Sequence, residues 1–348
     1  MDQLGGRKHR TDREHDHRVH RRCVIGALPG AKPGNGASRT VPTRLTAVPS
    51  AAELPKGIAT ELPLPHEPFS RLWDAILLDG PQKDRLLSQA LLSFTLRPKV
   101  DAAALPLHGL IVLVGPPGTG KTSLARGLAS RTAEAFGRSD GWQYLEVEPH
   151  AMASAGLGRS QQQVRQLLSE VIAERAAMGP LVVVLDEVET LAADRMKLSL
   201  EANPVDVHRA TDAVLAGLDQ LAAAFPNLLF VATSNFPAAI DRALLSRADL
   251  VEHIPLPGPQ TAATILQAAI GELIRHYPAA KHVLTDPAFA EAAAACAGLD
   301  GRQIRKLVIA ACTFDKQTAL DPGRLMAADL RRAAKSARRD LVPRNAIQ

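Results

Sequence analysis

The hydrophobic pattern predicts alternating strands and helices in the middle of the chain, from about residue 66 to residue 257. Short apolar runs alternate there with stretches whose apolar residues recur at helical spacing, which is typical of a parallel, doubly wound sheet. The run that ends in Asp186 and Glu187 has no polar alternation, so we expect its strand to be covered on both faces. The five runs that predict strands are residues 110–115, 144–147, 181–187, 228–235 and 251–256.

The pattern changes at both ends of this region. After Pro259, Ala-rich segments with apolar residues at helical spacing predict a small all-helical domain over residues 258–340, followed by a tail at 341–348. Residues 1–65 are polar, basic and rich in Pro and Gly, and such a segment cannot bury enough surface to order itself. We therefore expect a disordered segment at 1–65 and an α/β domain at 66–257.

Composition excludes several classes of protein. With 348 residues, 46% of them hydrophobic, the chain can bury a sizeable core. No apolar segment approaches the ~20 residues that cross a bilayer, and the charged first residues do not form a signal peptide, so we expect a cytoplasmic protein. The three cysteines have neither disulfide-scaffold numbers nor metal-site spacing. The net charge of +5 suggests nucleic acid as a partner, but much of this charge lies at the chain ends.

A phosphate-binding loop follows the first predicted strand. The sequence GPPGTGKTS matches the pattern G-x-x-x-x-G-K-[ST] between an apolar strand and a helical segment, which is the context that supports the match. Its glycines let backbone N–H groups surround phosphates at a helix N-terminus, Lys121 would reach the β and γ phosphates, and Thr122 would bind Mg²⁺. The residues expected to bind nucleotide are Gly115, Pro116, Pro117, Gly118, Thr119, Gly120, Lys121, Thr122, Ser123 and Asp186.

Polar residues at the ends of two other predicted strands complete a hydrolytic site. Adjacent carboxylates repel each other unless a cation lies beside them, so Asp186 is expected to hold Mg²⁺ through water as the acidic partner of Thr122. Glu187 would polarise the water that attacks the γ phosphate. Asn235 ends the next strand, where its amide would orient the same water.

These motifs resemble those of AAA+ ATPases, and within them the pachytene-checkpoint family, whose members remodel HORMA-domain proteins. The segments GPPGTGKTSL, LDEVETLAADR, NPVDVHRATDAVLAGLDQL, ATSN, IDRALLSRADL and GLDGRQIRKL follow the order of the family. The resemblance covers about residues 69–340. It implies a P-loop AAA+ core with a five-stranded parallel doubly wound sheet, a small all-α lid domain, and ATP and Mg²⁺ as ligands.

The resemblance also assigns roles to single residues. Arg247 in SRADL corresponds to the arginine finger that reaches the γ phosphate of a neighbouring subunit, with Arg242 as the alternative. Arg302 resembles the sensor 2 residue of the lid. Residues 72–80 resemble the segment that covers the adenine, although we expect Trp73 itself to pack in the core.

Two parts of the chain depart from the family. Relatives usually carry a folded N-terminal domain that docks substrate, whereas the residues before the expected ATPase core are largely polar here, so the choice of substrate is open. The central pore loop, which carries an aromatic residue in many relatives, is ASAGLGRS here. Gly156 and Leu157 are expected to form this loop, with leucine as its only apolar contact for a substrate.

The resemblance therefore implies a ring ATPase, a hexamer, that unfolds or remodels a HORMA-domain protein. It also implies a setting in bacterial anti-phage signalling. Two alternatives stay open. One is an AAA+ protein that acts on nucleic acid, such as a helicase or clamp loader, although a chain with 3% aromatic residues has few stacking platforms. The other is a nucleotide-dependent scaffold that does not hydrolyse ATP.

Overall fold

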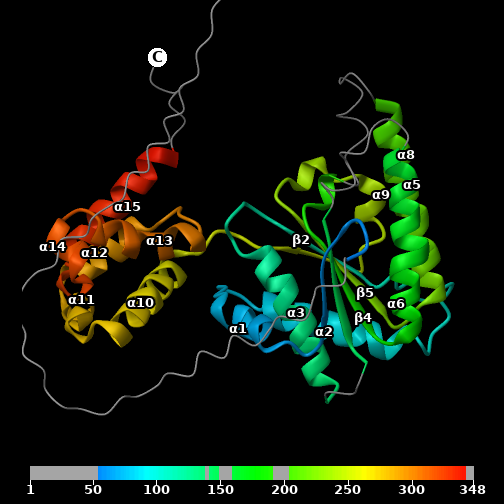
Figure 1. Cartoon of the computed structure of the whole chain (residues 1–348), viewed down its shortest axis with the longest axis horizontal. Coiled ribbons are helices and arrows are strands. Elements are labelled where there is room, and N and C mark those ends of the chain that lie inside the picture. The colour runs from blue at the N-terminus through cyan, green and yellow to red at the C-terminus, as the bar shows by residue number, and fades with distance from the viewer. Residues whose placement is uncertain (1–53, 138–140, 149–158, 191–203, 342–348) are drawn as a thin grey trace, which may run out of the picture. The chain divides into compact units, whose positions relative to one another are not determined.

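The computed structural model describes residues 54–137, 141–148, 159–190 and 204–341 (Figure 1). One sheet, in the order β1-β3-β4-β5-β2-β6, runs through the N-terminal part of these residues. All neighbouring strands are parallel except the pair β1 and β3. The strands are β1 (Ile58–Pro63), β2 (Leu110–Val114), β3 (Gln143–Val147), β4 (Leu181–Leu185), β5 (Leu228–Ser234) and β6 (Leu250–His253).

The helices fall into two sets along the chain. Those between the strands are α1 (Glu67–Ala75), α2 (Gln82–Leu96), α3 (Lys121–Ala135), α5 (Arg159–Gln166), the π-helix η1 (Leu167–Ile172), α6 (Ala173–Met178), η2 (Val188–Thr190), α8 (Pro204–Ala224), η3 (Pro237–Ala239) and α9 (Arg242–Leu245). Those after the last strand are α10 (Pro259–His276), η4 (Pro278–Lys281), α11 (His282–Thr285), α12 (Ala288–Ala295), α13 (Gly301–Cys312), α14 (Lys316–Leu320), η5 (Pro322–Arg324) and α15 (Ala327–Leu341).

The expected fold class is confirmed, because the five apolar runs form β2 to β6 and helices alone follow them. The prediction of disorder up to residue 65 is wrong for residues 58–63, which form a sixth strand antiparallel to β3. Ile58 and Leu62 pack on opposite faces of the sheet, because the register shifts between Ile58 and Thr60, so this short strand lacks a regular alternating pattern that the sequence could reveal. Its stability comes from pairing with β3, which is distant in sequence.

Each face of the sheet has its own apolar core. Successive residues of β2, such as Val112 and Leu113, point to opposite faces of the sheet and join different buried clusters. Helices α1, α2 and α3 cover one face, while α5, η1, α6 and α8 cover the other (Figure 1). Because β2, β4 and β5 are buried along their whole length, the absence of alternation in their sequences is explained.

The C-terminal helices enclose a separate core. Residues of α10, α12, α13 and α15 pack together, with Leu266, Ile304 and Leu330 fully buried. Helix α13 begins with a capping box, in which Asp300 accepts the N–H of Gln303 and the Gln303 side chain accepts the N–H of Asp300. Among the helices of the described ranges, none is both long enough and apolar enough to span a bilayer.

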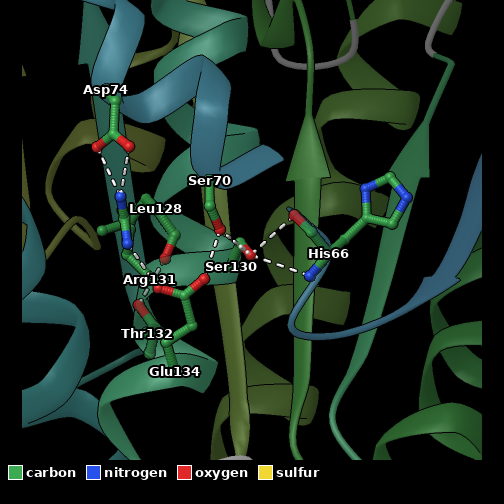
Figure 2. A network of polar contacts seen from close by, with 8 residues as sticks. All are labelled: His66, Ser70, Asp74, Leu128, Ser130, Arg131, Thr132 and Glu134. Carbon is green, nitrogen blue, oxygen red and sulfur yellow. Dashed lines mark hydrogen bonds and ion pairs between the residues drawn. The ribbon is translucent and has the colours of Figure 1, made fainter. Parts of the chain in front are cut away.

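Polar contacts fix α1 on the helix that follows the phosphate loop. The hydroxyls of Ser70 on α1 and Ser130 on α3 lie 2.8 Å apart, and Ser130 also accepts the N–H of His66 at 3.0 Å (Figure 2). Ser70 donates to Glu134, whose other oxygen accepts from Arg131 at 2.7 Å. Because Ser130 is fully buried, these partners satisfy a hydroxyl that would otherwise be costly inside the protein.

The same two helices approach closely at Gly127. A Cβ atom at this position would lie 2.6 Å from the Cβ and 2.9 Å from the Cα of Trp73. Trp73 itself is buried, with 8% of its surface exposed, as expected of a core residue. Glycine in the middle of α3 is therefore required by the crossing with α1.

We predict that Gly127→Ala destabilises the protein although alanine favours helices by about 1 kcal/mol over glycine. The backbone of Trp73 cannot move away cheaply, and overpacking of this kind costs about 1–3 kcal/mol. Gly271→Ala is the matched control, since Gly271 also lies inside a helix but nothing is within 4 Å of its added Cβ. Chemical denaturation should show a loss for the first variant and a gain of about 0.5–1 kcal/mol for the second. Equal effects would contradict the argument.

Candidate nucleotide-binding site

The register of three parallel strands brings the predicted residues to one edge of the sheet. Strand β5 lies between β2 and β4, with Ser234 opposite Val114 and Ala232 opposite Leu185. The polar segments that follow β2 and β4 therefore emerge on either side of the end of β5. This is the carboxyl edge, where open α/β sheets bind ligands.

The loop after β2 has a conformation that depends on glycine. Gly115, Gly118 and Gly120 have φ angles of 154°, 79° and 92°. A Cβ at Gly115 would lie 2.2 Å from the carbonyl oxygen of Ile254, so this position also has no room for a side chain. The loop leads directly into α3, whose N-terminus provides N–H groups and a favourable dipole for an anion. The geometry therefore fits a loop that surrounds phosphate groups.

Lys121 is buried at the start of α3 with its ammonium group fully engaged. It donates to the carbonyl oxygens of Gly115 at 2.9 Å and Pro116 at 2.8 Å, and to Oδ1 of Asn235 at 2.8 Å. Burial lowers the pKa of Lys121, and the nearby carboxylates, led by Glu189, oppose this shift. These acceptors are neutral, so an anionic phosphate would bind the ammonium group more strongly than they do.

The two adjacent acids have different surroundings. One oxygen of Asp186, Oδ1, accepts the hydroxyl of Thr122 at 2.7 Å and also the hydroxyl of Thr233. Thr233 in turn accepts the N–H of Glu187 at 3.2 Å. Glu187 has a positive φ of 51°, which is uncommon for a residue with a side chain and is often found at functional sites. This backbone turn separates the two carboxylates.

Asn235 connects the lysine to the second acid. Its Oδ1 accepts from Lys121, and its Nδ2 donates to Oε1 of Glu187 at 3.2 Å. Its backbone N–H donates to Oε1 of Glu189 at 3.1 Å, while Oε2 of Glu189 is buried without a partner among the described residues. The structure thus brings together the lysine, the asparagine and the acid that the sequence predicts to act on water.

Two neighbouring cavities adjoin the loop. A polar cavity of about 240 Å³ is lined by Lys121, Thr122, Asp186, Glu187, Asn235 and Arg302. A second cavity of about 380 Å³ has a largely apolar lining that includes Leu72, Ile76, Leu78, Pro257, Ile265 and Ile309. Gly118, Gly120, Ser123 and Arg302 line both cavities. A polar chamber beside an apolar one fits a ligand with phosphates at one end and a flat base at the other.

The end of α1 and the segment that follows it, residues 75–79, form hydrogen bonds with the start of α10 and with α13, two C-terminal helices with residues that line the apolar cavity. Asp79 accepts the N–H of Gly258 at 2.9 Å and the hydroxyl of Thr261, both at the start of α10. On α13, Arg305 donates to the carbonyl oxygen of Ala75. These bonds join the segment predicted to cover the adenine to α10 and to α13, the helix that carries Arg302.

The predicted finger lies away from this site. Arg247 forms a two-pronged ion pair with Asp219 on α8, at 2.7 and 2.8 Å, and does not line the polar cavity formed by the described residues. Its alternative, Arg242, is exposed at the first position of α9. The predicted pore residues, Gly156 and Leu157, lie outside the described residues.

The donor set also fits a magnesium ion. Thr122 and Asp186 supply a hydroxyl and a carboxylate that already lie within hydrogen-bonding distance of each other, beside the polar cavity. Mg²⁺ prefers a few oxygen ligands of this kind together with phosphate oxygens and water. Either residue can therefore take a place next to the ion without a change of the backbone.

The sequence analysis missed three residues that matter here. Thr233 lies within the β5 run and was counted only as part of a strand, yet its hydroxyl links both acids. Glu189 follows Glu187 by two positions in the same motif, which was a signal that it faces the same site. Asp219 had no local signal, because only the fold brings it to Arg247.

Comparison with known proteins agrees with this geometry. The model of the family described as ATPase family associated with various cellular activities (AAA) matches residues 111–256. CD-NTase-associated protein 6 of Pseudomonas aeruginosa is 54% identical over 289 residues, which are 83% of this chain and 95% of that protein. The Oryza sativa subsp. indica pachytene checkpoint protein 2 homolog is 34% identical over 220 residues, which are 62% of this chain but only 46% of that protein.

A similar fold is present in a solved assembly. A chain in the structure of the E. coli MS115-1 HORMA:CdnC:Trip13 complex aligns with a TM-score of 0.62 and 17% identity, over 80% of this chain and 94% of that one. The family resemblance in the sequence is thus confirmed by extended identity and by fold. The chain belongs to the pachytene-checkpoint family of AAA+ ATPases, among its bacterial members.

Proposed function

We propose that this protein hydrolyses ATP with Mg²⁺ and, assembled as a hexameric ring, uses the energy to remodel a HORMA-domain protein. The observation that carries the hydrolytic part is the set Lys121, Asn235 and Glu187, joined by hydrogen bonds beside a phosphate-binding loop. A scaffold that only binds nucleotide would not need this arrangement. The 54% identity to CD-NTase-associated protein 6 supports the rest of the proposal.

The residues of the site divide the reaction between them. Lys121 exchanges its neutral acceptors for the β and γ phosphates. Glu187 accepts a proton from the attacking water while the oxygen of that water bonds to the γ phosphorus. The bond from that phosphorus to the bridging oxygen breaks, and ADP leaves. Asn235 keeps Glu187 in place. Thr122 and Asp186 would hold Mg²⁺, which would neutralise negative charge that develops on the phosphate groups.

The contacts around the apolar cavity support a coupling of nucleotide to the lid. Arg302 lines both cavities, and Asp79 and Arg305 connect the covering segment with α10 and α13. A ligand that fills the cavities therefore touches the large domain and the lid together. In a ring, such coupling would move the pore loop around Leu157 against a substrate.

The choice of partner rests on relatives. The pachytene checkpoint names indicate the family whose members act on HORMA-domain proteins, and a chain of the same fold is part of a complex with HORMA and CdnC proteins. The Pseudomonas relative is named for an association with a CD-NTase. We infer a role in bacterial anti-phage nucleotide signalling for this chain as well.

Glu187→Gln should bind ATP normally and hydrolyse it at least about a hundredfold more slowly, because the water loses its proton acceptor while phosphate contacts remain. Lys121→Ala is the complementary variant and should lose ATP affinity, since the cation of the loop is missing. Calorimetry and a phosphate-release assay separate binding from turnover. Normal turnover by folded Glu187→Gln protein would contradict the assignment.

Arg247→Ala should bind ATP but fail to hydrolyse it, because a finger acts on the site of the next subunit. Mixed with Glu187→Gln subunits, it should regain part of its activity, as its intact site then receives a finger from a neighbour. Turnover of mixtures at several ratios measures this effect. If only Arg242→Ala behaves in this way, the finger is Arg242, and if mixing never restores turnover, the ring is not the active form.

The partner can be tested with the same trap. Glu187→Gln protein with ATP should retain a purified bacterial HORMA-domain protein through gel filtration, while wild-type protein with ATP releases it. Lys121→Ala is the control, and it should not retain the partner because it does not form the ATP state. Identical elution of the HORMA-domain protein with all three proteins would exclude it as the substrate.

A further inference from the structure

Arg247 is held on two sides by its own subunit. Its Nε and Nη2 donate to the two oxygens of Asp219 at 2.7 and 2.8 Å, and its Nη1 donates to the carbonyl oxygen of Ala243 at 2.8 Å. The first partner lies on α8 and the second on α9, so the contacts come from two different elements. Three contacts of this kind fix both the position and the plane of the guanidinium group.

The N–H donors of Arg247 that these three bonds leave unused are available to a further acceptor. A guanidinium group has five N–H donors, with one on Nε and two on each terminal nitrogen. The three bonds above use one donor on each nitrogen, which leaves one on Nη1 and one on Nη2 of Arg247. Two parallel N–H groups on the terminal nitrogens are the pair that binds phosphate oxygens in a forked manner.

The pair is also accessible. The side chains of Arg247 and Asp219 are 25% and 43% exposed, so the contact lies at the surface of the described subunit. Arg247 is not among the described residues that line the polar cavity around Lys121. Its terminal N–H groups therefore do not act in the nucleotide site of their own subunit. In the proposed ring, the anion within reach of these N–H groups would be a phosphate bound by a neighbouring copy.

We propose that Asp219 is a positioning residue that presents the guanidinium group of Arg247 to the nucleotide of the neighbouring subunit. This inference rests on the ring ATPase proposed above. Asp219 acts through Arg247, since a carboxylate itself would be repelled by phosphate. The hydrogen bonds from Arg247 lower the pKa of Asp219, so the residue is ionised at neutral pH and the ion pair persists.

The test compares Asp219→Asn and Asp219→Ala with wild-type protein. We expect kcat to fall about ten- to hundredfold, as for misplaced catalytic groups, while KM for ATP and the melting temperature change little. Asp219→Glu should restore part of the rate because it keeps the charge. Glu61→Ala is the matched control, since Glu61 forms a similar part-buried pair with Arg175 but lies on the edge strand β1; its kcat should not change.

Two further readouts separate positioning from a purely structural role. In an Arg247→Lys background, which keeps a cation without the forked donors and should retain measurable turnover, Asp219→Ala should lower kcat much less than it does in wild-type protein, because its effect is transmitted through the missing guanidinium group. Asp219→Ala subunits should also regain activity when mixed with Glu187→Gln subunits, as the defect lies in the finger given to the neighbour. An equally large loss of kcat on Asp219→Ala in the Arg247→Lys and wild-type backgrounds, or failure to complement, would overturn the proposal.

The outcome also distinguishes this inference from the proposed function. If Arg247→Ala abolishes turnover while Asp219→Asn and Asp219→Ala are fully active, Asp219 is only a surface ion-pair partner and the inference is wrong. Faster turnover of Asp219→Ala would instead identify Asp219 as a latch that holds the finger back, which also overturns positioning. If Arg247→Ala and Glu187→Gln both keep normal turnover, the proposed ATPase mechanism itself has failed.

Discussion

The site depends on the position of β5 between the strand that carries the phosphate loop and the strand that carries the acids. With that order, Asn235 at the end of β5 can reach Lys121 on one side and Glu187 on the other. A different order of the same strands would keep every motif in the sequence but would not place Asn235 between the lysine and the acid. Strand order, which is set by packing of the helices on both faces, is therefore the constraint on which the chemistry rests.

Charge balance explains why a lysine can be buried here. Desolvation favours its neutral form, but three carboxylates nearby, Glu189, Asp186 and Glu187, favour the charged form. The ammonium group has three direct acceptors, and all are uncharged oxygen atoms. The site thus stabilises a buried cation and leaves its strongest interaction for an anion, because an anion adds the Coulomb attraction between opposite charges that these neutral acceptors lack.

The parts of the site that the sequence could predict are those coded by neighbouring residues. The loop from Gly115 to Ser123 and the acids at the end of β4 are contiguous motifs whose chemistry is local. The roles of Thr233 and Asp219 could not be predicted, because each depends on a contact between segments far apart in the chain. Strand β1 was missed for the same reason, since its order comes from pairing with β3.

The segment that carries Arg247 is bound both to α8, through Asp219, and to the start of β2, through Asp249. Asp249, two residues further on, accepts the N–H groups of His108, Gly109 and Leu110 at 2.8, 2.6 and 3.2 Å. Leu110 begins β2, the strand whose other end leads into the phosphate loop. An arginine fixed only by Asp219 could swing with α8, whereas one whose backbone is also bound to β2 keeps a defined distance from the central sheet. Such a double attachment is what a group must have if it is to meet a phosphate on another subunit with atomic accuracy.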